Sequence, residues 1–204
     1  MKALVTRKIG MTSTINQNGV VEAITLLSVG DNVVTQVKNS ERDGYTAIQV
    51  GFESKKDINK AQVGHSKAAG VTPRYFREFR ISDDVLMPEI GTKITADTFE
   101  VGDMVHATGI SKGKGWAGTI KRHNFHRQRA THGGKGNTRK PGSIGSMYPQ
   151  HIFKGKKMAG QMGHVKTTVT KLTIALVNTE LNVIGVKGAV PGPRKGIVII
   201  KGAK

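Results

Sequence analysis

Short runs of β-branched and apolar residues, separated by turn residues, occupy most of the chain on either side of a long polar stretch. The runs lie at 20–29, 32–37, 45–52, 75–81, 102–111, 167–178, 181–188 and 196–202. Runs of this length favour strands, and Asn18-Gly19 and Asp43-Gly44 are typical of tight turns. Residues 55–69 fit a helix best, although Gly64 lowers the helix propensity there. This spacing of strands predicts a mainly β protein with an antiparallel barrel rather than βαβ units.

Predicted strands lie on both sides of the polar stretch, which follows the strand at 102–111 and precedes the strand at 167–178. We therefore expect an insertion between two strands of one β-domain rather than a tail. Because both ends of such an insertion are anchored, less entropy is lost when it becomes ordered on a partner.

Charge divides the chain more sharply than hydrophobicity does. Residues 1–103 contain thirteen Lys or Arg and thirteen Asp or Glu, whereas residues 104–179 contain fourteen Lys or Arg, six His and no carboxylate. A block of like charge repels itself unless a polyanion neutralises it. A membrane surface fits less well than nucleic acid, since the block has no basic amphipathic helix with an aromatic face.

Composition argues against several other classes of protein. The chain has no apolar run of about 18 residues, so we expect no membrane span, and its N-terminus MKALVTRKIGM lacks the apolar core of a signal peptide. The chain contains no Cys, which excludes disulfides and thiolate metal sites and fits a reducing cytoplasm.

The first part of the block, GISKGKGWAGTIKRHNF at 109–125, mixes basic residues with glycine and aromatic residues. Glycine lets backbone N–H groups approach a phosphate closely, and Lys112, Lys114, Lys121 and Arg122 supply positive charge. Trp116 and Phe125 can stack on unpaired bases. The alternative is a flexible solvated loop, with Trp116 packed into the barrel core.

Two other motifs in this part suggest different chemistry. Residues 113–118 match G-x-G-x-x-G, but no carboxylate follows for more than sixty residues, so the ribose partner of a dinucleotide site is missing. His123, His126 and His132 suggest a metal site, yet the block has no Cys or carboxylate to complete it, and neighbouring arginines oppose a dication. We expect neither a nucleotide cofactor nor a metal, and polar contacts to RNA fit the histidines better.

The second part of the block, residues 131–163, continues the same composition. Pro141 and Pro149 favour an extended backbone, while Lys154, Lys156 and Lys157 form a dense basic cluster. A segment without apolar residues for a core can fold around a polyanion, with counterion release adding to the affinity. A glycine-rich finger fits irregular folded RNA better than a regular DNA groove, which a helix or ribbon usually reads.

Four motifs between residues 108 and 196, TGISKGKGWAGTIKRHNF, THGGKGNTRKPGSIG, FKGKKMAGQMG and VKGAVPGPRKG, resemble in order and spacing the universal large-subunit ribosomal protein L-three family of bacterial type. LVTRKIGMT resembles the family's opening strand and VTQVKNSERDGYTAIQVGF its next signature, so the resemblance covers about residues 4–200.

The resemblance implies a translation-protein-type β-barrel formed by 1–124 and 154–204, with a small appended α/β region at about 54–95. It also implies a long basic loop at 125–153 that penetrates the rRNA toward the peptidyl transferase centre. The implied RNA-binding residues are Lys112, Lys114, Trp116, Lys121, Arg122, Arg127, Arg129, His132, Lys135, Arg139, Lys140, Lys154, Lys156 and Lys157. The implied residues of the loop tip are Ser143, Met147, Tyr148 and Gln150.

The tip departs from the family pattern. SMYPQHI at 146–152 is one residue shorter than in many bacterial relatives, and Gln150 follows Pro149 where those relatives often have Gly. Some members are methylated on a glutamine before the proline. The residue that best matches that position is Tyr148, so the resemblance gives no reason to expect methylation of Gln150.

The function that the resemblance implies is structural. We expect a cytoplasmic constituent of the large ribosomal subunit that binds 23S-type rRNA, nucleates early assembly and supports RNA near the catalytic centre, without a cofactor or catalysis of its own. Its expected neighbours are rRNA and the ribosomal proteins L-fourteen and L-nineteen. The alternatives are an enzyme that processes nucleic acid with its His cluster and a protein that shapes DNA.

Overall fold

The chain folds as two compact units in the computed structural model, which describes residues 2–16, 18–81 and 87–203. The first unit, here called the barrel unit, comprises Met1–Ile110 and Lys166–Lys204. The second, the inserted unit, is Ser111–Val165. Each unit is described by itself below.

Six antiparallel strands form a closed barrel in the order β1-β12-β7-β10-β11-β2. Their bounds are β1 Ala3–Ile15, β2 Val21–Ser28, β7 Met104–Ile110, β10 Lys166–Asn178, β11 Val183–Lys187 and β12 Ile197–Gly202. The first and last strands of the chain are therefore neighbours, and closure leaves the barrel itself without an unpaired edge. The prediction of a mainly β protein with an antiparallel barrel is confirmed.

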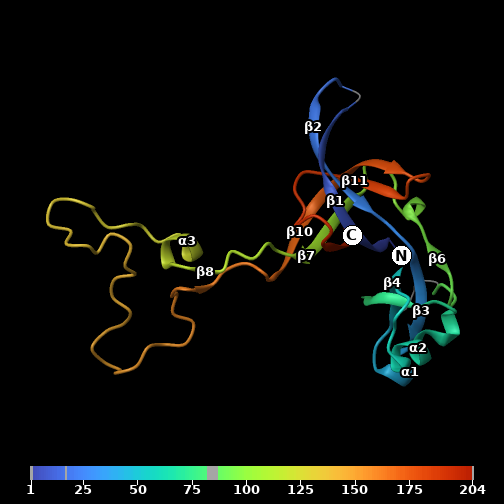
Figure 1. Ribbon diagram of the computed structural model, residues 1–204, viewed down its shortest axis with the longest axis horizontal. Coiled ribbons are helices and arrows are strands. Elements are labelled where there is room, and N and C mark those ends of the chain that lie inside the picture. The colour runs from blue at the N-terminus through green and yellow to red at the C-terminus, as the bar shows by residue number, and fades with distance from the viewer. Residues whose placement is uncertain (1, 17, 82–86, 204) are drawn as a thin grey trace. The chain divides into compact units, whose positions relative to one another are not determined.

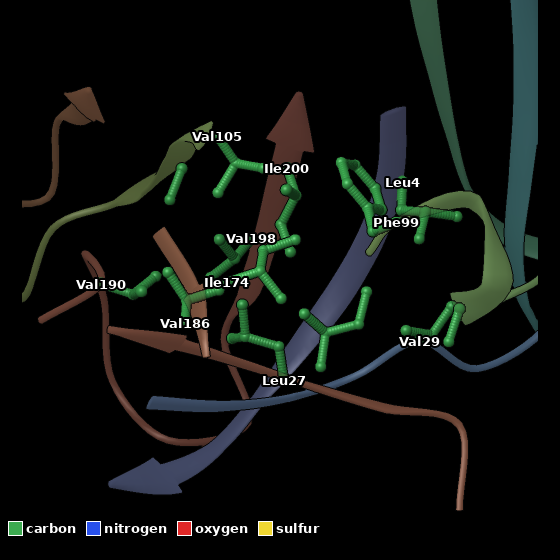
Figure 2. Close-up of a cluster of buried hydrophobic side chains, with 13 residues drawn as sticks. Leu4, Leu27, Val29, Phe99, Val105, Ile174, Val186, Val190, Val198 and Ile200 are labelled. Carbon is green, nitrogen blue, oxygen red and sulfur yellow. The ribbon is translucent and has the colours of Figure 1, made fainter. Parts of the chain in front are cut away.

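The barrel is filled by aliphatic side chains from all six strands together with Phe99. Figure 2 shows Leu4, Leu27, Ile174 and Ile200 converging in this core, and all four are fully buried. Successive side chains of a strand point to opposite faces. In consequence β1 and β12 use their alternate residues in a second core, described next.

The barrel unit also contains a four-stranded sheet, in the order β5-β4-β3-β6 (Figure 1). Its strands are β3 Asn32–Lys38, β4 Ala47–Ser54, β5 Pro73–Arg80 and β6 Lys93–Ile94. Its own core contains Val50, Phe52 and Phe79, packed with Ala3 and Val5 of β1. The strands expected at 32–37, 45–52 and 75–81 thus form, but in this sheet and not in the barrel.

Polar side chains join this sheet to the barrel. Asn32, only 1% exposed, accepts a hydrogen bond from the Val5 N–H and donates to the carbonyls of Val5 and Val29. Arg7 of β1 donates to both carboxylate oxygens of Glu53 at the end of β4. Because these buried or half-buried groups satisfy one another, they hold the two sheets in one arrangement.

The helical elements of the barrel unit are short: α1 Ser40–Asp43, α2 Lys60–Ser66, η1 Lys67–Ala69 and η2 Ala96–Thr98. The helix expected over 55–69 forms only from Lys60, so its predicted start is wrong. Asn59 caps α2 by accepting a hydrogen bond from the Ala61 N–H, and the Lys55 N–H instead donates to the Thr72 carbonyl. A good N-cap residue inside the segment set the start of the helix. No helix in the described ranges is long and apolar enough to span a membrane.

The inserted unit joins two neighbouring strands of the barrel. It follows β7 at Ile110 and precedes β10 at Lys166, and these two residues are Cα partners in the β7–β10 ladder. Its regular structure consists of β8 Trp116–Ala117, α3 Thr119–His123 and β9 Gly160–Gln161. Residues 124–159 contain neither helix nor strand, and Figure 1 shows them as a long irregular loop (yellow to orange).

Candidate functional site

The inserted unit holds twelve Lys or Arg residues and no Asp or Glu. The barrel unit differs, since its cations form ion pairs such as Lys38 with Glu78 and Lys2 with Asp103. With no carboxylate in the unit, its positive charges repel one another, and their field favours a polyanionic ligand.

The side chains predicted to bind RNA are all exposed. They are Lys112, Lys114, Trp116, Lys121, Arg122, Arg127, Arg129, His132, Lys135, Arg139, Lys140, Lys154, Lys156 and Lys157. The predicted tip residues Ser143, Met147, Tyr148 and Gln150 are exposed as well. The structure thus leaves every one of these residues open to a partner, while their contacts with RNA remain predictions.

A backbone clasp closes the base of the inserted unit, where the chain enters and leaves. The Ser111 N–H donates to the Val165 carbonyl at 2.9 Å, the Lys114 N–H to Met162 at 2.9 Å and the Met162 N–H to Gly115 at 2.9 Å. β8 and β9 continue this ladder for two further residue pairs. These hydrogen bonds hold residues 111–117 beside residues 160–165, without an apolar core between them.

Gly163 allows the strands of the clasp to approach. A Cβ at this position would lie 2.1 Å from the Lys112 carbonyl oxygen, and the residue has a φ of +72°. Both facts exclude a larger side chain without a shift of the backbone.

Arg122 has an internal partner as well as an exposed position. Its Nη1 donates to the Met158 carbonyl at 2.8 Å, and Nε2 of His123 lies 3.1 Å from the same oxygen. α3 is therefore tied to the returning chain just before β9. We assign Arg122 a role in positioning this segment, which sequence reasoning missed because a backbone carbonyl acceptor leaves no signal in the sequence.

The irregular loop has local structure of its own. The Gln128 N–H donates to the Thr138 carbonyl, and the N–H groups of Asn137 and Lys140 donate to Gly134 and Asn137. Gly134 permits the turn, because a Cβ there would lie 2.5 Å from the Arg129 carbonyl oxygen. These bonds shape the loop that carries Arg129, His132, Lys135 and Arg139, and apolar burial contributes little to it.

Aromatic side chains in the inserted unit face solvent. Trp116 is 79% exposed, so the alternative that packs it into the core is wrong. Tyr148 and Phe153 are also largely exposed, and the Tyr148–Pro149 peptide is cis. Aromatic faces next to cations suit single-stranded or irregular nucleic acid, because bases stack on the rings while phosphates meet Lys and Arg.

The histidines do not gather into a chemical centre. In the described part of the chain, no group of three or more His, Asp or Glu side chains is arranged to hold a metal ion. Nε2 of His123 lies next to the Met158 carbonyl oxygen, and the centroid of its ring is 6.2 Å from that of Phe125. His151 packs edge-on against Phe153. The arrangement supports binding through charge and stacking.

Barrel, clasp and carboxylate-free loop together define a class: a β-barrel protein with an exposed polycationic insertion. A sequence model described as ribosomal protein L3 matches residues 68–183. Among curated proteins, the chain is 47% identical to the large ribosomal subunit protein uL3 of Alkaliphilus metalliredigens, covering 98% of this chain and 97% of that protein.

Two further relatives agree. The chain is 46% identical to the proteins of the same name from Bifidobacterium longum and Bacillus thuringiensis, covering 99% of this chain and 96% and 97% of theirs. The chain belongs to the ribosomal protein L3 family.

Proposed function

We propose that this protein is a structural constituent of the large ribosomal subunit in the cytoplasm, and that it binds large-subunit rRNA through the inserted unit. Its curated relatives are named as large-subunit proteins. The family resemblance extends the proposal to early subunit assembly and to support of RNA near the peptidyl transferase centre. It also suggests the ribosomal proteins L-fourteen and L-nineteen as neighbours.

The observation that carries the proposal is the exposure of twelve cationic side chains in a unit without a carboxylate. RNA offers closely spaced phosphates, and each contact releases condensed counterions, which adds to the affinity. A folded RNA also offers unstacked bases to Trp116, Tyr148 and Phe153.

Within the unit we propose two kinds of residue. The lysine and arginine side chains beyond the clasp bind phosphate, and Arg127, Arg129 and Arg139 can do so with two parallel hydrogen bonds. Arg122 and the clasp hold the two arms in register instead. The loop that enters RNA is proposed to span 125–153, within the inserted unit.

Salt dependence tests the proposal. Binding of a large-subunit rRNA fragment to the full chain should weaken by about three or more decades between ~50 and ~200 mM salt if roughly 6–10 phosphates are contacted. A nearly flat response measured by filter binding or fluorescence titration would contradict it.

A matched pair of variants locates the contacts. Replacing Lys154, Lys156 and Lys157 by Gln should lower the slope of log affinity against log salt by about two to three. The same replacement at Lys55, Lys56 and Lys60, exposed in the barrel unit, removes equal charge and should change the slope much less. Equal effects would mean that net charge alone drives binding.

Amide exchange tests the proposed order of the loop. Residues 125–153 should exchange rapidly in the free protein and slowly in the complex with rRNA, because the hydrogen bonds within the loop are local and no apolar core supports them, whereas RNA adds further partners. Strong protection without RNA would contradict this.

The competing hypothesis is a nucleic-acid-processing enzyme that uses His123, His126 or His132. The discriminating measurement is the integrity of RNA incubated with the pure protein, with and without divalent metal. Cleavage that disappears in a His126→Gln variant would favour the enzyme, whereas intact RNA supports a structural role.

A further inference from the structure

The β1–β2 hairpin extends beyond the closed barrel as a two-stranded arm (blue in Figure 1). β12 pairs with β1 only over Ala3–Arg7, and β11 pairs with β2 only over Ile24–Ser28. The β1–β2 ladder itself continues outward to the pair Ile15–Val21. In the described ranges, no other strand pairs with the outer edge of residues 9–15.

The outer part of the arm, residues 9–21, is uncharged; Glu22, next along β2, is paired with Lys187. Residues 9–21 read IGMTSTINQNGVV and contain no Lys, Arg, His, Asp or Glu, in a chain whose formal net charge is +18. Soluble proteins usually protect an open strand edge with lysine, other charges or proline. Residues 11–15 carry none of these, although the Arg194 guanidinium lies beside Gly10 at the inner end of the edge. We infer that something covers the outer part of this edge in the functional assembly.

One face of the arm is apolar and open to solvent. The ladder places Met11, Ser13 and Ile15 of β1 on the same face as Ala23 and Val21 of β2. Met11 is 50% exposed, Ile15 69% and Val21 67%. A row of apolar side chains beside unpaired backbone groups is the surface that an added β-strand needs.

The arm is ordered before any partner arrives. The Asn16 side-chain oxygen accepts hydrogen bonds from the N–H groups of Asn18 and Val20, and its amide donates to Glu22 at 2.9 Å. The Asn16 N–H donates to the Val20 carbonyl, which closes the turn. A partner strand would therefore meet a formed template and would lose less entropy on binding.

We propose that the outer edge of β1, residues 9–15, is a docking site for an extended, predominantly apolar segment of a neighbouring protein, which adds to the hairpin as a strand. RNA is disfavoured because residues 11–21 carry no cation for a phosphate, and the cations at the base of the arm, Arg194 and Lys187, lie beside Gly10 and Glu22. A second copy of this chain is disfavoured because two molecules of charge +18 repel. The inference rests on the proposed function, since the neighbour belongs to the same ribosomal particle.

The test uses full-length protein with p-benzoylphenylalanine in place of Met11, assembled into large subunits and irradiated. We expect one adduct with a peptide of another large-subunit protein. The same photoreactive group at Val63, an exposed position on α2, serves as the control and should not reach that peptide. Amides of residues 9–15 should exchange more slowly in the subunit than in the free protein, which reports strand pairing.

A double variant links the adduct to the apolar face. Ile15→Lys with Val21→Glu places an opposite-charge pair at a cross-strand position, which preserves the hairpin while removing apolar surface. We expect loss of the adduct with unchanged thermal stability and rRNA affinity. If the variant unfolds, the adduct and the amide exchange of the parent decide the question.

Three results would overturn the docking site alone: subunits that contain the protein but give an adduct with rRNA, an adduct with a second copy, or no adduct. An adduct without amide protection would overturn strand addition. Failure of the protein to enter large subunits would overturn the proposed function as well, so the two failures are distinguishable.

Discussion

The barrel unit and the inserted unit share one chain but are stabilised by different means. The barrel unit buries a continuous apolar cluster, with Leu4, Ile174 and Ile200 fully inaccessible. In residues 111–165 only Ala117, Thr119 and Gly160 are buried. Burial of apolar surface contributes about 25 cal/mol per Å² to the free energy of folding. Hydrophobic burial therefore stabilises the barrel unit far more than the inserted unit.

Charge differs in the same way. In the barrel unit, carboxylates accept hydrogen bonds from cations, as Glu22 does from Lys187 at 2.7 Å. The inserted unit contains no carboxylate, so none of its cations has an acidic partner within the unit. The comparison teaches that one unit balances its charges internally around an apolar core, whereas the other has neither a core nor an internal counter-charge, as the proposed binding of RNA requires.

The largest effect is expected from removing the inserted unit. Because Ile110 and Lys166 are Cα partners, an Asn-Gly turn can replace residues 111–165 and close β7 and β10 as a hairpin. The affinity for rRNA should fall on the order of a thousandfold at low salt, while the thermal transition of the barrel changes little. Calorimetry and an RNA titration measure both, and an unfolded barrel would refute the independence of the two units.

A core truncation probes the barrel unit. Ile174→Ala should lower the free energy of unfolding by about 2–5 kcal/mol, because it removes buried methyl groups and leaves a cavity. The matched change Ile144→Ala, at a position 41% exposed in the inserted unit, should cost less than about 0.5 kcal/mol. Urea unfolding of the two variants gives both values. Similar losses would mean that the inserted unit contributes to the core.

A glycine substitution probes the clasp. Gly163→Ala brings a Cβ against the Lys112 carbonyl at positive φ, a strain of about 1–3 kcal/mol. Amides of Lys114 and Met162 should then exchange about tenfold faster or more, with the barrel transition unchanged. Gly145→Ala, where an added Cβ meets nothing within 4 Å, is the control. Unchanged exchange in Gly163→Ala would contradict the clasp.

The smallest expected effect is the pH dependence of stability. It arises from the carboxylates of the barrel unit, since the inserted unit has none. The Lys38 ammonium and then the Tyr45 hydroxyl donate to Glu78 and lower the pKa of its carboxyl below the ordinary 4.5. A lowered folded pKa stabilises the protein above the ordinary pKa, and this stability is lost as pH falls through the folded value.

Glu78→Gln should therefore flatten the acid limb of stability below pH 4.5. The difference should stay below about 1 kcal/mol, because the side chain is partly exposed to solvent. Urea unfolding between neutral and acidic pH measures it, with the exposed Glu180→Gln as control. An unchanged acid limb would show that the Glu78 contacts are energetically silent.

Local patterns predicted much of the fold. The run at 196–202 became β12 at Ile197–Gly202, because a continuous apolar run at 197–200 fits a strand whose two faces pack on different cores. The start of the helix at 55–69 was wrong, because the Asn59 cap and the tertiary contact of Lys55 with Thr72 outweighed propensity. The exposure of Trp116 was left open, since a large ring in a glycine-rich segment suits either core or ligand.

The sequence by itself determined most of the longer strands and that residues 111–165 are cationic without a carboxylate, because side-chain period and charge are properties of the chain alone. Only the tertiary structure decided that β1 closes the barrel against β12 and that β3 and β4 leave it for a second sheet. It also decided that Arg122 bonds to the Met158 carbonyl. Backbone N–H and C=O groups are the same in every strand, so they do not specify which strands pair. The pairing is decided by long-range packing, which exists only in the folded protein.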